Sequence, residues 1–321
     1  MILGANMASS QVMRTRDALL MGGRFDITIV APDSLTAERM IDTVIAEITR
    51  IEYLISDWKP TTQVSLINKL AGIRPVRVDK EVLELTERAI AISRLTEGAF
   101  DISFAAMERI WKFDGTMTQM PARADVKRAR RYVGYKDILI DKEKSTVFLR
   151  KKGMKIGFGA LGEGYAADRC RALMLSKGIN SGIINATGDI QAWGSRPDGA
   201  PWRIGINDPF ENGALVAAIP LDGAVTTSGS YEKYAVINGK RYAHIINPAT
   251  GYPATGLTSV TVTGPGAETA NALSTSLMVM GAKKGLQLLR QFPDYECLMI
   301  TDKGKYVTSP GFDLESVRIG E

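Results

Sequence analysis

The chain has 321 residues, which is enough for one large or two modest domains. Hydrophobic residues make up 45% and charged residues 23% of it, an ordinary globular composition that argues against long disordered segments. No apolar run reaches the roughly 20 residues that a membrane span requires. Two cysteines exclude a disulfide framework or a zinc ribbon, and a formal net charge of +5 is mild for this length.

Residues 1–20 are predicted to be an N-terminal extension, native or added, that precedes a single domain over residues 21–321. Residues 1–10 lack the charged region and the following apolar region that a signal peptide requires. Two interpretations therefore stay open: the protein is cytosolic, or it is a mature form from which a leader has been removed.

The first half of the domain is predicted to hold one strand and several helices. Residues 24–30 alternate and are rich in β-branched side chains, which predicts a strand. The turn at 31–34 then supplies the N-cap of a long amphipathic helix with apolar residues at Ala37, Met40, Ile41, Val44, Ile45, Ile48, Ile51 and Leu54. A second helix begins near Asp79 and stops at Gly98. The basic run 127–131 is interpreted as the solvated face of a short helix, so no nucleic-acid partner is expected.

Beyond Tyr135 the pattern changes to strands with intervening helices. We predict a hairpin formed by 137–140 and 146–149, a helix that begins after Gly164 and ends at Gly178, and a helix from about Glu268 to Gly281. Further strands are predicted at residues 182–185, 202–206, 215–219 and 257–263. Strands and helices do not alternate strictly, which favours an α+β architecture of mixed sheets with packed helices over a doubly wound sheet.

Glycine-rich and polar loops in the second half predict a polar cleft. Residues 157–165, GFGALGEGY, open a helix, where glycines let backbone N–H groups approach a phosphate. The spacing is not that of a dinucleotide fingerprint, so a tight structural turn is an equal alternative. Two further polar turns are predicted at strand ends, at 185–189 and 226–231. Together the loops indicate a cleft in this half of the chain.

The single histidine, His244, follows a predicted strand and precedes the turn sequence at 247–251. Loops at strand ends often carry functional residues, so a catalytic role competes with a structural one. No Gly-x-Ser-x-Gly motif supports a serine triad. Asn271 and Thr275 lie four positions apart on a predicted helix and share one face. That spacing suits two oxygen ligands of a hard cation, or an ordinary polar helix surface.

A set of ordered segments resembles the ApbE family, the FAD:protein FMN transferases. The resemblance extends over about residues 21–281 and is carried by residues 21–23, 56–58, 65–68, 98–101, 162–168, 185–189, 227–229 and 244–251. It implies an enzyme that binds FAD beside a divalent cation, usually Mg²⁺. The enzyme would transfer FMN to a Thr or Ser hydroxyl of an acceptor protein and release AMP.

The resemblance also implies a role for individual residues. His244 would act in the transfer step, by taking the hydroxyl proton or by orienting the acceptor. The implied metal ligands are the carbonyl of Ala160 and the side chains of Asn271 and Thr275. Glu163, at a position that is often Lys in relatives, would face the phosphates. The other implied cofactor-binding residues are Met21, Trp58, Ala99, Phe100, Asp101, Asp189 and Ser228.

Two positions depart from the family pattern, since relatives usually carry Asp where Gly157 and Asn271 stand. The loss of two carboxylates would weaken the cation site while leaving flavin binding intact. Two alternatives therefore stay open: an FAD pyrophosphatase that yields FMN and AMP, and a non-catalytic FAD-binding protein. The resemblance further implies the cell envelope or the periplasmic side of the inner membrane, reached through a lipid anchor that this chain does not display.

Overall fold

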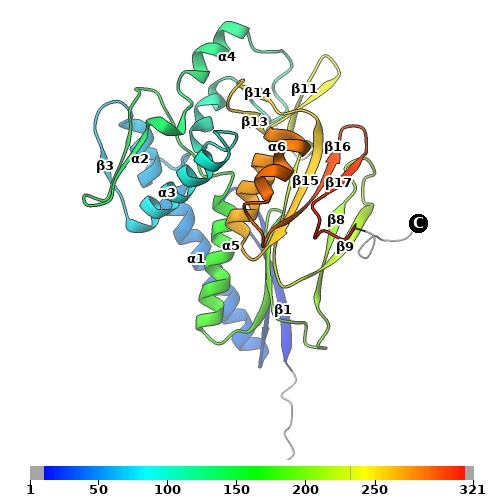
Figure 1. The fold of residues 1–321 in the computed structure, drawn as a ribbon. Coiled ribbons are helices and arrows are strands. Elements are labelled where there is room, and N and C mark those ends of the chain that lie inside the picture. Colours follow the sequence, from blue (N-terminus) through cyan, green and yellow to red (C-terminus); the bar gives the residue numbers. More distant parts are fainter. Residues whose placement is uncertain (1–10, 232, 315–321) are drawn as a thin grey trace, which may run out of the picture.

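The computed structural model describes residues 11–231 and 233–314 and is organised around an eight-stranded sheet (Figure 1). Each pair of neighbouring strands in this sheet is antiparallel. The strands, in spatial order, are β1 (Val12–Leu20), β2 (Gly23–Ala31), β6 (Ser181–Ala186), β7 (Asp189–Trp193), β10 (Gly223–Gly229), β15 (Leu257–Gly264), β16 (Glu296–Thr301) and β17 (Tyr306–Thr308).

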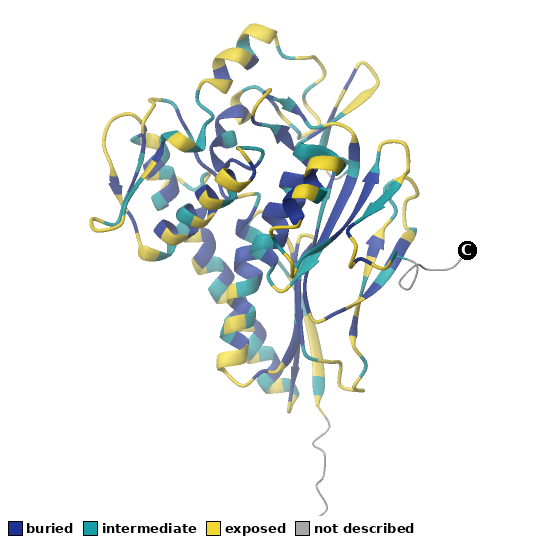
Figure 2. Ribbon diagram, in the orientation of Figure 1, coloured by how far each residue is buried: buried dark blue, intermediate teal, exposed yellow. Residues whose placement is uncertain are grey.

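Three long helices cover one face of this sheet, as Figure 1 shows. They are α1 (Ser34–Ile55), α5 (Gly162–Ser176) and α6 (Ala267–Leu289). α1 packs on β1 and β2, α5 on β6 and β7, and α6 on β10 and β15. Their inward faces and the facing strand residues are buried, while the outward helix faces are exposed (Figure 2). Apolar residues at helical spacing explain this arrangement, since each helix buries one stripe.

The other face of the sheet is covered by the hairpin of β8 (Trp202–Asn207) and β9 (Leu215–Leu221). A second, smaller core forms there between hairpin residues such as Trp202 and Ile219 and the sheet residues Val30, Val225 and Ile300. Strand alternation places Ile29 in the helix-side core and its neighbour Val30 in the hairpin-side core. The strands that the hairpin covers are therefore buried on both faces, whereas the edge strand β1 is mostly exposed.

Two smaller groups of elements flank the helices. The first comprises α2 (Gln63–Lys69), α3 (Lys80–Leu95) and a three-stranded sheet of β3 (Val76–Arg77), β5 (Thr146–Leu149) and β4 (Ile138–Asp141). The second comprises the 3₁₀ helices η1 (Ile102–Arg109) and η2 (Tyr135–Asp137), the helix α4 (Arg123–Arg130), and the hairpins β11 (Tyr234–Ile237)–β12 (Lys240–Ala243) and β13 (Ile246–Asn247)–β14 (Tyr252–Pro253). Met107, Trp111 and Ile246 join η1 to the hairpins in a third core.

The α+β architecture of mixed sheets and packed helices is confirmed, and so are the main predicted helices. Asp33 caps α1 by accepting a hydrogen bond of 2.8 Å from the backbone N–H of Thr36. Gly281, with φ of 75°, interrupts α6 at the predicted position, but a further helical segment follows it. No helix in residues 11–231 and 233–314 is long and apolar enough to cross a bilayer.

The structure refines one sequence prediction and contradicts another. The predicted extension over residues 1–20 includes β1, which pairs with β2 from Val12 opposite Ala31 to Leu20 opposite Gly23. β1 is an edge strand whose side chains are mostly exposed, so its hydrophobic alternation is faint. The predicted turn at 226–231 is largely strand, since β10 continues to Gly229. Residues 1–10, where the leader was assessed, lie outside the described residues.

One half-buried carboxylate ties α5 to the start of α6. Asp168 on α5 accepts hydrogen bonds from the backbone N–H groups of Ala267 (2.8 Å) and Glu268 (2.9 Å). These donors belong to the first turn of α6, and the α6 N-cap, Gly266, has no side chain to satisfy them. The helices approach so closely here that a Cβ on Gly164 would lie only 2.4 Å from the carbonyl oxygen of Ala267.

Asp168 makes stability depend on pH. Burial raises the pKa of its carboxyl from the ordinary 3.8 to about 6. The folded protein therefore holds this proton more tightly than the unfolded chain does. The contribution of the protonated Asp168 to the free energy of unfolding is complete below pH 3.8 and is lost as the pH rises through 6. We expect the stability of the wild type relative to Asp168→Asn to fall across this window, by at most about 3 kcal/mol. Urea denaturation at pH 4, 5, 6 and 7 measures this difference.

The matched control is Asp198→Asn, on an exposed loop where Asp198 pairs with Arg196 at 3.4 Å. Its difference from the wild type is expected to be small and nearly constant over the same pH range. A wild-type minus Asp168→Asn difference that stays flat from pH 4 to 7 would contradict this account of Asp168.

Candidate active site

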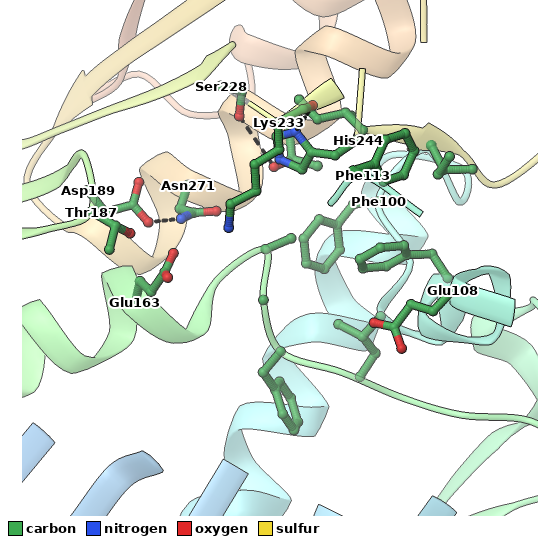
Figure 3. Close-up of a pocket in the computed structure, with 18 of the residues that line it drawn as sticks. Phe100, Glu108, Phe113, Glu163, Thr187, Asp189, Ser228, Lys233, His244 and Asn271 are labelled. Carbon is green, nitrogen blue, oxygen red and sulfur yellow. Dashed lines mark hydrogen bonds between the residues drawn. The ribbon is translucent and has the colours of Figure 1, made fainter. Parts of the chain in front are cut away.

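A pocket of about 760 Å³ opens where several separate elements meet, at the start of α5, the inner face of α6, the β6–β7 turn, η1 and the segment after β12. Figure 3 shows side chains from these elements converging on one space. The volume lies within the range typical of cofactor and small-molecule sites.

The pocket brings together every residue that the family resemblance in the sequence assigns to the site. Residues that are up to 254 positions apart in sequence line this one space: Met21, Trp58, Ala99, Phe100, Asp101, Ala160, Glu163, Asp189, Ser228, His244, Asn271 and Thr275. Their individual roles stay predictions, and the geometry below constrains what each side chain can do.

One end of the pocket is walled by aromatic rings. Phe100 is buried beneath it, and Trp58 lies at the rim with 60% of its surface exposed. Trp111 stacks on Phe113 with ring centroids 6.1 Å apart, and the Trp111 indole N–H donates to the carbonyl of Gly251 at 2.8 Å. Flat apolar surfaces of this kind suit a heteroaromatic ring.

Asp101 lies at the aromatic end but has a structural function there. One carboxylate oxygen accepts hydrogen bonds from the backbone N–H and the hydroxyl of Ser103, at 2.8 and 2.6 Å. The other accepts from the backbone N–H of Tyr135 at 2.7 Å. Burial raises the pKa of the Asp101 carboxyl despite these bonds. Asp101 therefore fixes the start of η1, which carries part of the pocket wall.

Glu163 stands in the first turn of α5, at the opposite end of the pocket from the aromatic wall (Figure 3). Its carboxylate accepts a hydrogen bond from Thr187, in the β6–β7 turn, and burial raises its pKa. Thr187 has a φ of 55°, a left-handed backbone conformation that is uncommon outside glycine. The positive charge of Lys233 acts on Glu163 from across the pocket.

A polar network on α6 lies beside Glu163. Asn271 is buried, with 8% of its surface exposed, and its amide nitrogen donates to the carboxylate of Asp189. This hydrogen bond sets the orientation of the amide, so its oxygen faces the pocket (Figure 3). The Ser228 hydroxyl lies 2.8 Å from that of Ser274 and 3.5 Å from that of Thr275. The side-chain oxygens of Asn271, Thr275 and Ser228 thus collect at one end of the pocket.

His244 follows β12, as predicted, and lies on the pocket wall near Phe113, with ring centroids 6.4 Å apart. Its Nδ1 is 3.1 Å from the backbone carbonyl oxygen of Lys233. Because a carbonyl only accepts, Nδ1 carries the proton and Nε2 is left as the basic nitrogen. Burial lowers the pKa of the imidazole, and the nearby Lys233 charge adds to this. His244 is therefore neutral at neutral pH.

Several pocket residues were assigned no role from the sequence. Asp57 is half-buried and Glu108 is more exposed; removal from water raises the pKa of both carboxyls, and Lys155 lies 3.4 Å from Glu108. A Cβ on Gly157 would lie 3.3 Å from an oxygen of Asp57, so Asp57 occupies the space beside this glycine. Sequence reasoning also missed Lys233, because a single lysine in a hairpin connection resembles any surface lysine.

The donors for a metal ion are neutral oxygens rather than a carboxylate cluster. No group of three or more His, Cys, Asp or Glu side chains that could hold a metal ion occurs in the described part of the chain. Asn271, Thr275 and Ala160 nevertheless all line the pocket. Oxygen donors of this type fit a hard cation such as Mg²⁺.

Known proteins resemble this chain over most of its length. The model of the ApbE family matches residues 21–299. The chain belongs to the ApbE family. The resemblance noted in the sequence is thereby confirmed. Curated relatives named FAD:protein FMN transferase include one from Klebsiella pneumoniae, which is 30% identical over 91% of this chain and 90% of its own length. Another, from Treponema pallidum, is 30% identical over 87% of this chain and 81% of its own length.

Solved ApbE structures have the same fold as this chain. The ApbE protein of Thermotoga maritima superposes with a TM-score of 0.87 and 32% identity, covering 96% of this chain and all of its own. The flavin transferase ApbE of Vibrio cholerae superposes with a TM-score of 0.85 and 26% identity, covering 94% of this chain and 98% of its own. The mixed α/β architecture described above is thus the ApbE fold.

Asp101 offers a direct test of how the pocket wall is held. Asp101→Ala removes the acceptor of three hydrogen bonds and leaves buried donors unpaired, so the free energy of unfolding should fall by about 2–3 kcal/mol. Asp114→Ala is the matched control, because Asp114 makes the same pair of bonds to Thr116 in an exposed loop. Its expected loss is below about 1 kcal/mol. Equal losses in urea denaturation would contradict the role of Asp101.

Proposed function

We propose that this chain is a flavin transferase that moves FMN from FAD to a Ser or Thr hydroxyl of an acceptor protein and releases AMP. The observation that carries the proposal is the placement of a neutral imidazole, His244, on the same pocket as an oxygen-rich end and an aromatic end. Membership of the ApbE family supports the same activity.

The shape and lining of the pocket suit FAD. The aromatic end, with Phe100 and Trp58, offers flat apolar surface for the isoalloxazine ring. The opposite end, at the first turn of α5, places a helix N-terminus and the oxygens of Asn271 and Thr275 around a position for the pyrophosphate. A volume of about 760 Å³ provides room for a large part of this ligand.

The reaction requires an aligned nucleophile and an acceptor for its proton. The hydroxyl oxygen of the acceptor protein attacks the phosphorus of the FMN phosphate, and its proton passes to Nε2 of His244. The bond from this phosphorus to the bridging oxygen of the pyrophosphate breaks, and its electron pair leaves with AMP. Phosphoryl transfer of this kind depends mainly on positioning and on charge stabilisation.

The oxygens of Ala160, Asn271 and Thr275 would hold a divalent cation, which we propose is Mg²⁺. When bound, this cation supplies neutralisation of the pyrophosphate charge. Asn271 contributes a neutral oxygen, while the carboxylate of Asp189 lies behind it and fixes the amide. The negative charge of Asp189 would thus lie close to the cation, although its carboxylate would not be a direct ligand.

His244 and the transfer reaction are tested together. Incubation with FAD, Mg²⁺ and an acceptor that carries a short Ser/Thr motif should yield a protein band that fluoresces after denaturation. His244→Ala should slow transfer by about 10²–10⁴-fold. Because burial lowers the pKa of His244, the acid limb of the kcat/KM profile should lie below pH 6.5. FMN and AMP formed without acceptor would indicate a pyrophosphatase, and intact FAD under every condition would indicate a binding protein.

The cation site is tested by binding rather than by turnover. Asn271→Ala removes one oxygen ligand and should weaken Mn²⁺ affinity, measured by electron paramagnetic resonance with ADP present, by about tenfold or more. Asn212→Ala, in an exposed loop outside the pocket, is the control and should bind Mn²⁺ as the wild type does. Equal affinities for all three proteins would contradict the assignment of Asn271.

The acceptor protein and the location of the enzyme are inferences from the family alone. We propose that the acceptor presents its Ser or Thr on an exposed segment, since the pocket opens beside the exposed Trp58. The proposed location is the cell envelope. Fractionation of cells that express the native gene product, with immunodetection in each fraction, tests it.

A further inference from the structure

Lys233 places a positive charge inside the pocket. Its backbone belongs to the connection between β10 and β11, and its side chain points into the pocket, toward the end that carries Asn271 and Glu163 (Figure 3). It acts on the Glu163 carboxylate through charge rather than through a hydrogen bond. Its ammonium group thus points at the oxygen-rich end of the site.

The charges that line the pocket are strongly unbalanced. Lys233 is the only lysine or arginine among the lining residues that the structure describes. The same lining carries six carboxyl groups, those of Glu52, Asp57, Asp101, Glu108, Glu163 and Asp189. Lys59 offsets Glu52 at 3.2 Å and Lys155 offsets Glu108 at 3.4 Å, but neither lysine lines the pocket. An anionic ligand that enters this pocket therefore meets one fixed positive side chain.

The backbone of Lys233 is fixed to His244. The Lys233 carbonyl oxygen accepts a hydrogen bond from the backbone N–H of His244 at 2.9 Å and lies 3.1 Å from its Nδ1. The β11–β12 hairpin joins the two residues, with Tyr234 paired to Ala243. A phosphate held by the Lys233 ammonium is therefore held by the same segment that orients the imidazole.

We propose that Lys233 binds a phosphate oxygen of the dinucleotide ligand and positions the pyrophosphate next to His244. This inference rests on the proposed function of the pocket. Glu163 opposes Lys233 in this proposal, because its negative charge attracts the ammonium of Lys233 and repels a bound phosphate. Removal of the Lys233 charge should weaken phosphate-bearing ligands, and removal of the Glu163 charge should strengthen them.

The test measures equilibrium binding of three probes, ADP, FAD and riboflavin, by calorimetry at fixed Mg²⁺. Riboflavin has the flavin ring but no phosphate, whereas ADP has a pyrophosphate but no flavin. Lys233→Met should weaken the binding of ADP and of FAD by about tenfold or more, because a charge-assisted contact to phosphate is lost. Riboflavin affinity should change less than about twofold. Lys233→Arg should restore most of the ADP affinity, and Glu163→Gln should raise it.

The matched control is Lys240→Met. Lys240 lies on the adjoining β11–β12 hairpin and is exposed. Its ammonium lies 5.4 Å from the ring centroid of Tyr242, and it does not line the pocket. Its loss should leave all three affinities unchanged. Two results with the Lys233→Met variant would overturn the inference. One is an ADP affinity equal to that of the wild type, and the other is an equal loss of riboflavin affinity, which would mean that Lys233 has a structural role.

These measurements need no acceptor protein and no turnover, so they separate the inference from the proposed function. If ADP and FAD bind with the predicted dependence on Lys233 but no FMN is transferred, the transferase proposal fails and the role of Lys233 stands. If FMN is transferred and Lys233→Met binds ADP normally, the role of Lys233 fails alone. A wild-type protein that binds no ADP overturns the role of Lys233 as well.

Discussion

The contact between α5 and the start of α6 positions the site. Asp168 accepts two backbone hydrogen bonds from the first turn of α6, and the lack of a side chain on Gly164 lets the helices approach. α5 starts at the pocket, which places Glu163 there, and the facing side of α6 adds Asn271. Both helices are held on one sheet, so the oxygen-rich end of the pocket is built on rigid elements.

Electrostatics decides what the pocket can bind. Burial raises the pKa values of Asp57, Asp101, Glu108 and Glu163, which lowers the cost of lining the site with carboxyl groups. In the proposed function, a pyrophosphate would add negative charge to this lining. A divalent cation and the ammonium of Lys233 would compensate for it, and His244, whose pKa is lowered by burial, would be left as the proton acceptor.

Much of the fold is predictable from the sequence because helix signals are local. The eight apolar positions of α1 and its Asp33 cap define that helix without reference to the rest of the chain. β1 carries no such signal, since an exposed edge strand needs little hydrophobic alternation. The site was predicted through family motifs. Spacing alone does not show that Met21 and Thr275 line one pocket, and it does not reveal that Lys233 points inward or that Asp57 fills the space beside Gly157.

We propose that one pocket holds FAD with its pyrophosphate at the start of α5 and its flavin at the aromatic end. The decisive experiment is a crystal structure of the complex with FAD and Mn²⁺, with anomalous scattering to locate the metal. We expect the metal beside Asn271 and Thr275, and the pyrophosphate between Lys233 and the first turn of α5. FAD bound in the reverse orientation, or outside this pocket, would contradict it.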